Sequence, residues 1–185
     1  MDRPPILRAF RMHLTDLLAP DRVAIRTSIR NPEIPSASGG DPTGHVPHTL
    51  DKKEALALLA SLLARGNERV RPDDIERVLV EREQLQSTGI GDGVAIPHGA
   101  LPELDAQVAS LLIAPEGLDF DAIDSQKVTL LFAVMGPKRA TGEHLKTLAR
   151  VSRLLRNKAF RDQLVRAPSP EVAYSLIAKE EADQK

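Results

Sequence analysis

Three side chains with the chemistry to bind and transfer an anion, His98, His144 and Arg82, stand at special places in the pattern. His98 ends the segment 93–98 and precedes Gly99, where the missing Cβ lets a backbone approach a ligand closely. Pro97 restricts the backbone just before it. An imidazole is mostly neutral at pH 7, because its ordinary pKa is about 6.5. A lone histidine is more often structural, so the candidacy of His98 depends on its neighbours.

His144 and Arg82 are the expected neighbours. If Thr141 is the N-cap of the helix that follows, His144 lies in its first turn, where the helix dipole attracts anions and disfavours imidazolium. Arg82 shares a helix face with the apolar positions 75, 78 and 79. A charged side chain on an apolar stripe requires either an interaction partner or a functional role. Two imidazoles and a guanidinium suit an anion, and phosphate above all.

Other patterns fit a reactive site less well. The glycines of 89–93 follow a predicted helix and lead into a strand, unlike the dinucleotide fingerprint, and predict a tight turn with positive φ. His45 and His48 have a metal-compatible spacing, but their Pro/Gly-rich surroundings favour a solvated loop. The acidic segment 119–124 lacks the spacing of a calcium loop and predicts a turn. Ser87 lies in no hydrolase motif. His13 lies in the N-terminal segment and has no discernible partner residues for a site.

Helices gathered around central strands must position the candidate residues. The segments 106–114 and 127–135 predict strands, and the second is almost continuously apolar, as in a strand covered on both faces. A short strand is predicted over 93–98, and 14–25 predicts a short helix and a first strand. Helix starts are predicted by a capping box at Asp51 and Glu54, by Pro72, and by N-caps at Thr141, Asn157 and Ser169. This order favours an α/β fold, a three-layer αβα sandwich with a small mixed sheet.

The composition excludes several classes of function. A formal net charge of −1 provides no basic field for nucleic acid, and 3% aromatic residues provide no stacking platform for bases. The absence of cysteine removes disulfides and thiolate chemistry. No apolar run approaches the ~18 residues of a membrane span, and the first residues do not form a signal peptide. We therefore expect a cytoplasmic protein without membrane insertion.

The chain is expected to form one domain with an extension. Residues 1–26 supply an N-terminal helix and the first strand, and 27–49 form a flexible Pro/Gly/Ser-rich insert. Residues 50–180 make up the main part of the domain, and 181–185 are a tail.

Three segments carry a specific resemblance: REQLQSTGIGDGVAIPHG from Arg82, FDAIDSQKVTLLFAVMGP from Phe120 and EHLKTLARVSRLL from Glu143. Together they resemble the type-2 enzyme IIA domain of the bacterial phosphoenolpyruvate-dependent sugar phosphotransferase system, the fructose/mannitol class, and within it the stand-alone nitrogen-related regulators. The resemblance implies the mannitol IIA-like sandwich fold. It also implies His98 as the phosphorylated histidine, Arg82 as the arginine lining its site and His144 as the second active-site histidine. The amides near Gly99 are further candidates for stabilising the phosphoryl group.

The resemblance also implies a reaction and its partners. A phosphohistidine on the small carrier HPr, or on its nitrogen-branch paralogue, would pass its phosphoryl group to His98, without a metal or other cofactor. Because no IIB or IIC segment is attached, a regulator whose phosphorylation state changes its partner proteins is favoured. A separate IIB would instead make the chain a sugar-uptake component, and a non-catalytic binding module is the third alternative.

Overall fold

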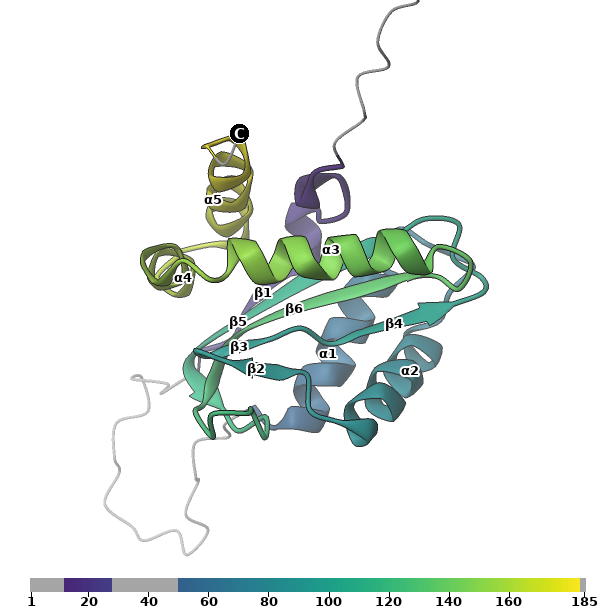
Figure 1. Cartoon of the computed structure of the whole chain (residues 1–185), viewed down its shortest axis with the longest axis horizontal. Coiled ribbons are helices and arrows are strands. Elements are labelled where there is room, and N and C mark those ends of the chain that lie inside the picture. The colour runs from purple at the N-terminus through teal and green to yellow at the C-terminus, as the bar shows by residue number, and fades with distance from the viewer. Residues whose placement is uncertain (1–11, 28–49, 184–185) are drawn as a thin grey trace, which may run out of the picture.

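A mixed β-sheet with helices on both faces is seen in the computed structural model, which describes residues 12–27 and 50–183 (Figure 1). His45, His48 and nearly all of the expected insert lie outside the described residues. The elements in chain order are η1 (Leu14–Asp16), η2 (Pro20–Arg22), β1 (Val23–Ile25), α1 (Lys52–Ala64), α2 (Pro72–Leu85), β2 (Gly89–Gly91), β3 (Val94–Ala95), β4 (His98–Leu101), β5 (Val108–Leu118), β6 (Val128–Pro137), α3 (Thr141–Leu154), α4 (Lys158–Val165) and α5 (Pro170–Asp183).

The sheet has the strand order β1-β5-β6-β3-β2, and β4 also pairs with β6. Three pairs of strands are parallel: β1 with β5, β3 with β6, and β4 with β6. Two pairs are antiparallel: β5 with β6, and β2 with β3. The mixed sheet expected from the sequence is therefore confirmed. Among the strands that the structure describes, β4 pairs only with β6, so no described strand lies along its other edge.

The strand expected over 93–98 is interrupted in the structure. Ala95 of β3 lies opposite Leu131 of β6, and His98 of β4 lies opposite Val134, so the register continues across the break. Pro97 has no N–H to give to the ladder, although its carbonyl accepts a hydrogen bond from the N–H of Val134 at 3.0 Å. The strand resumes at His98 and runs three residues further than expected.

The glycine-rich segment contains both a short strand and a turn, and together with β3 it forms a hairpin. Gly89–Gly91 form the strand β2, which pairs with β3, so the predicted turn over 89–93 is too long. Positive φ is confined to its second half, with values of 94° at Gly91, 56° at Asp92 and 74° at Gly93. Glycine adopts this conformation without a Cβ clash, which explains its use beside Asp92.

Each face of the sheet has its own apolar core. Helices α1 and α2 cover one face, with residues such as Leu59, Leu79 and Ala95 in the core between. The other face packs against α3, α4, α5 and the N-terminal turns, with residues such as Phe132 and Val151 in that core (Figure 1). The predicted three-layer arrangement is confirmed.

Most of the predicted helix starts are confirmed. Asp51 and Glu54 form a reciprocal capping box at α1, α2 begins at Pro72, and the side chain of Asn157 accepts a hydrogen bond at the start of α4. Thr141 as an N-cap is wrong. Ala140 is the N-cap of α3, because a turn closed by the Ala140 N–H and the Pro137 carbonyl (3.1 Å) starts the helix one residue earlier.

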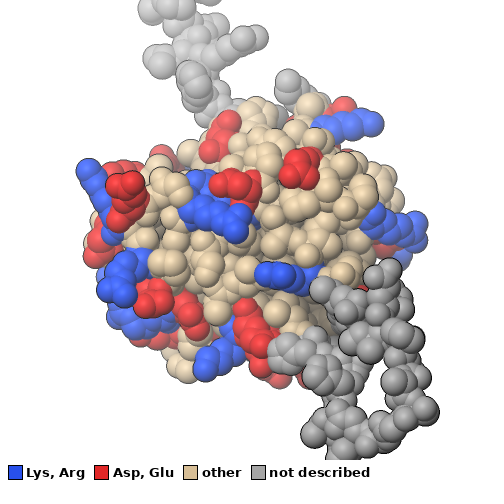
Figure 2. Space-filling view, turned by 180° about the vertical axis from the view of Figure 1, so that it is seen from behind, with Lys and Arg blue, Asp and Glu red and all other residues tan. Residues whose placement is uncertain are grey.

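The surface carries charges of both signs. On the side opposite to that of Figure 1, basic and acidic side chains are intermixed (Figure 2), in keeping with the net charge of −1. Among the helices that the structure describes, none has the length and apolar character to cross a membrane.

Candidate functional site

His98 is the first residue of β4, and both of its ring nitrogens have defined neighbours. Nδ1 lies 2.8 Å from the carbonyl oxygen of Ile96. Because a carbonyl only accepts, Nδ1 must carry the proton of the neutral ring. Nε2 is then the unprotonated nitrogen, and it accepts a hydrogen bond from Nε of Arg82 at 3.3 Å. The His98 residue is half-buried, so part of it is in contact with solvent.

Arg82 reaches His98 from the last turns of α2. Its Nη1 donates to the carbonyl of Gln86 at 2.9 Å, which fixes the guanidinium at the end of the helix. Nη2 has no partner among residues 12–27 and 50–183 and remains available to an anion. No described strand lies along the other edge of β4, and the side chain from α2 reaches a histidine on the α3 face of the sheet.

His144 approaches His98 from the other layer. It is the fourth residue of α3, and the two ring centroids are 5.9 Å apart with the planes tilted by 48°. Nδ1 of His144 is buried without a hydrogen-bond partner among the described residues. Strand alternation explains the meeting, since His98 follows Val94 and Ile96 at intervals of two, and both belong to the core on the α3 side.

Gly99 is required by packing. It lies opposite Met135 of β6, and a Cβ added to it would meet Cγ1 of Val78 in α2 at 2.4 Å. Real Cβ atoms do not make contacts that short. The absent side chain therefore lets α2, which carries Arg82, lie against the strand that carries His98.

Burial and neighbouring charge keep both histidines neutral. Burial lowers the pKa of His98 and the Arg82 guanidinium lowers it further, which outweighs the opposite effects of the Ile96 carbonyl and of Glu83. Burial also lowers the pKa of His144, and the charge that His98 would carry adds to this effect. At pH 7 the site therefore presents two neutral imidazoles and one permanent cation.

The other sequence candidates lie in structural roles. The hydroxyl of Ser87 donates to the carbonyl of Phe120 at 2.9 Å, and the backbone N–H of His13 donates to Asp16 at the start of η1. In the acidic segment 119–124, the predicted turn is confirmed, and Asp124 accepts the N–H of Asp92 at 2.8 Å. Within the described part of the chain, no three His, Asp or Glu side chains are grouped so as to hold a metal ion.

The sequence analysis missed one buried acid beside the site. Glu83 follows Arg82 in α2 and is 7% exposed, and its carboxylate lies 2.8 Å from Nζ of Lys52. The signal for it is in the helix pattern. Position 83 comes four and eight residues after Leu79 and Ile75, on the buried stripe.

Comparisons with known proteins agree with this arrangement. The sequence model of the family described as phosphoenolpyruvate-dependent sugar phosphotransferase system, EIIA 2, matches residues 45–180. A nitrogen regulatory protein of Pseudomonas aeruginosa is 38% identical over 126 residues, which is 68% of this chain and 82% of that protein. Another from Bradyrhizobium diazoefficiens is 33% identical over 170 residues, covering 90% and 95%.

A solved structure extends the likeness to three dimensions. The nitrogen regulatory protein IIA-Ntr of Neisseria meningitidis superposes with a TM-score of 0.72 at 26% identity, covering 89% of this chain and 98% of that one. The chain belongs to the EIIA type 2 family of the phosphoenolpyruvate-dependent sugar phosphotransferase system. Within that family, its similarity to the nitrogen regulatory proteins supports a phosphocarrier with a regulatory role.

Proposed function

We propose that the chain is a protein-histidine phosphotransferase in which Nε2 of His98 accepts a phosphoryl group from a phosphohistidine on an HPr-like carrier. One observation carries this proposal: the Ile96 carbonyl holds the proton on Nδ1, and the lone pair of Nε2 faces a guanidinium. A neutral, oriented nitrogen beside a permanent cation is what an incoming phosphoryl group needs.

The transfer requires no reactant other than the donor phosphohistidine and His98. The P–N bond of the donor breaks, its electron pair returns to the donor imidazole, and the lone pair of His98 Nε2 forms the new P–N bond. His98 keeps its Nδ1 proton, which the Ile96 carbonyl stabilises as the ring gains positive character. The donor is already an activated phosphoramidate, so no nucleotide takes part.

Arg82 and His144 have separate tasks in this proposal. Charge spreads over the three equatorial oxygens of the phosphoryl group in a loose transition state, and the free Nη2 of Arg82 can bond to one of them. His144, 5.9 Å away between ring centroids, faces the same space from α3 and supplies a polar wall with little charge. The amides near Gly99 remain candidates for the third oxygen.

Regulation follows from the change in charge. A phosphoryl group on His98 adds up to about two negative charges to a surface site and can make or break contacts with a partner protein. The similarity to nitrogen regulatory proteins supports this use over sugar uptake. A sugar-uptake component would pass the phosphoryl group to a separate IIB, and a binding module would not be phosphorylated.

Phosphorylation with phosphoenolpyruvate, enzyme I and HPr tests the proposal directly. We expect acid-labile labelling of the wild type, none in His98→Ala, and unchanged labelling in His13→Ala, the control for removing a histidine. Arg82→Ala and His144→Ala should be labelled more slowly and remain folded. Labelling that survives in His98→Ala contradicts the assignment. Wild-type rates in either of the other variants contradict the task given to that residue, and onward transfer to a IIB would favour the sugar-uptake alternative.

A further inference from the structure

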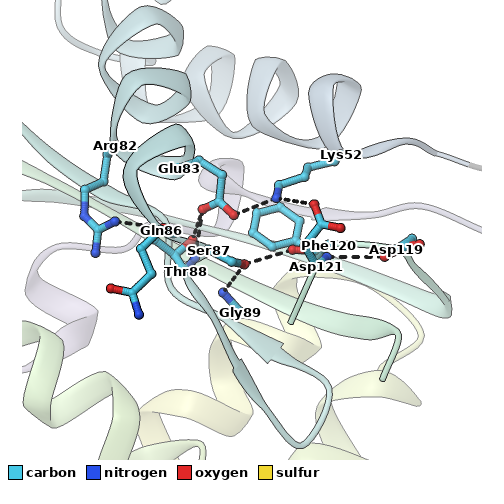
Figure 3. A network of polar contacts seen from close by, with 10 residues as sticks. All are labelled: Lys52, Arg82, Glu83, Gln86, Ser87, Thr88, Gly89, Asp119, Phe120 and Asp121. Carbon is cyan, nitrogen blue, oxygen red and sulfur yellow. Dashed lines mark hydrogen bonds and ion pairs between the residues drawn. The ribbon is translucent and has the colours of Figure 1, made fainter. Parts of the chain in front are cut away.

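A polar cluster around the buried carboxylate of Glu83 holds the end of α2 immediately after Arg82. Figure 3 shows this cluster, which we call the Glu83 cluster and which consists of Lys52, Glu83, Thr88 and Asp121. Oε2 of Glu83 accepts two hydrogen bonds from Thr88, from its backbone N–H at 2.9 Å and from its hydroxyl at 2.5 Å. Oε1 of Glu83 is paired with Nζ of Lys52 at 2.8 Å.

The buried part of this cluster is the pair between Lys52 and Glu83. The Glu83 side chain is 4% exposed and that of Lys52 26%, whereas Asp121, 2.9 Å from the same Nζ, is 78% exposed. Nζ also lies 4.8 Å from the centroid of the Phe120 ring. Although burial lowers the pKa of Lys52, the two carboxylates raise it above its ordinary value, so the ammonium stays charged. Solvent screens the Asp121 contact, so the Glu83 contact is the stronger one.

Two routes connect Glu83 to the nitrogens of His98. On the first, the carbonyl of Thr88, whose N–H is bound by Glu83, accepts the N–H of Ile96 at 3.0 Å. The Ile96 carbonyl in turn accepts Nδ1 of His98. On the second, Glu83 is the next residue of α2 after Arg82, which donates to Nε2 of His98. The residues that contact the two ring nitrogens, Ile96 and Arg82, are therefore both linked to Glu83, Ile96 through Thr88 and Arg82 as its neighbour in α2.

Stability alone does not account for a charged pair at this position. The cost of removing two charges from water offsets most of their attraction, and an apolar pair of similar size is often as stable. The carboxylate of Glu83 accepts hydrogen bonds from both the backbone N–H and the hydroxyl of Thr88. An apolar side chain could not accept either of them. The contacts of Glu83 are thus suited to keeping Thr88 in a fixed position relative to α2.

We infer that Glu83 is a positioning residue for phosphoryl transfer, acting with Lys52 to hold the Ile96 carbonyl and the Arg82 guanidinium around His98. This inference rests on the function proposed above. Glu83 touches neither the imidazole nor the incoming phosphoryl group. Its effect on the reaction passes through Thr88 and through the end of α2.

Glu83→Gln is the first test. The amide has nearly the same volume and keeps one acceptor oxygen, but it loses the charge that attracts Lys52. We expect a folded protein whose kcat for phosphorylation by HPr falls about tenfold, the scale of effect of a small misplacement, while KM changes little. Glu81→Gln is the matched control, because Glu81 is exposed on the same helix and the charge change is identical. It should keep the wild-type rate.

A spectroscopic test is independent of phosphorylation. In the unphosphorylated wild type, the ¹⁵N shifts of His98 should show the Nδ1–H tautomer. In Thr88→Val, which loses the hydroxyl bond to Glu83, and in Glu83→Gln, the Nε2–H tautomer should gain population. Wild-type rates and wild-type tautomer in both variants overturn the inference. If Glu83→Gln does not fold, Lys52→Met breaks the same pair from α1 and is judged by the same two measurements. A wild type that is not phosphorylated would instead contradict the proposed function, and the tautomer would still decide the positioning role.

Discussion

At the scale of single residues, the two nitrogens of His98 show how local structure gives each ring nitrogen a different neighbour. The Ile96 carbonyl comes from two residues earlier in the chain, and the break at Pro97 turns it toward Nδ1. From the sequence, Pro97, His98 and Gly99 could be singled out as a presented histidine. Which nitrogen is reactive could not be predicted, because it depends on a backbone carbonyl whose direction no residue type specifies.

The titration of His98 should report its surroundings. We expect an NMR titration midpoint below the ordinary value of about 6.5, because burial and the Arg82 guanidinium both favour the neutral ring. Arg82→Gln should raise the midpoint, since it removes a positive charge that faces Nε2. Arg77→Gln, an exposed arginine of the same helix, should leave the midpoint unchanged. A midpoint in Arg82→Gln equal to or below that of the wild type would contradict the assigned electrostatics.

At the scale of elements, local rules predicted most boundaries, and the differences occur near the site. The capping box of Asp51 and the cap of Asn157 are confirmed because they depend on residues three positions apart. Thr141 is not the N-cap, because the preceding turn from Pro137 determines where α3 starts. The strand 93–98 is divided because Ile96 gives its N–H to Thr88 and Pro97 has none. The bond between Thr88 and Ile96 joins β2 to the end of β3, and such pairing between strands is not contained in local propensity.

The close approach of α2 to β4 predicts a sharp difference between two glycine substitutions. Gly99→Ala should destabilise the fold by about 1–3 kcal/mol, the usual cost of overpacking, because the new Cβ meets Val78, whose branched side chain cannot turn away easily. It should also slow phosphorylation, since α2 carries Arg82 away from His98. For Gly142→Ala, no atom of the described residues outside its own helix turn lies within 4 Å of the new Cβ, and the position is in the first turn of α3, so the change should be neutral or stabilising.

Urea unfolding and initial phosphorylation rates measure both effects. The close-packing explanation predicts that Gly99→Ala loses stability and rate together, while Gly142→Ala keeps both. Equal stability of the two variants would mean that α2 can shift without cost, and the explanation would fail.

At the scale of the molecule, the site lies where three layers meet. Arg82 comes from the helix layer on one face, His144 from the layer on the other face, and His98 from the strand between them. The three layers could be predicted from the order of elements. The strand order, which leaves no described strand along the other edge of β4, could not, because parallel neighbours are chosen by long-range packing.

The whole fold should therefore be sensitive to the protonation of this site. His98 and His144 both have a pKa below the ordinary value in the folded protein, so below about pH 6.5 the unfolded chain binds more protons than the folded one. Their contribution to stability is complete above that pH and is lost as the pH falls toward the folded-state values. The slope cannot exceed about 1.4 kcal/mol per pH unit for each histidine.

Urea unfolding at pH 7.5, 6.5 and 5.5 measures this dependence. The free energy of unfolding of the wild type should fall across this interval, and that of the double variant His98→Ala/His144→Ala should fall less. Carboxylates such as Asp124, whose pKa the N–H groups of Gln126 and Asp92 lower, contribute at more acidic pH, so they do not disturb the comparison. Parallel slopes for the two proteins would show that the histidines are as easily protonated in the fold as in the unfolded chain. That result would contradict the neutral site on which the proposed phosphoryl transfer depends.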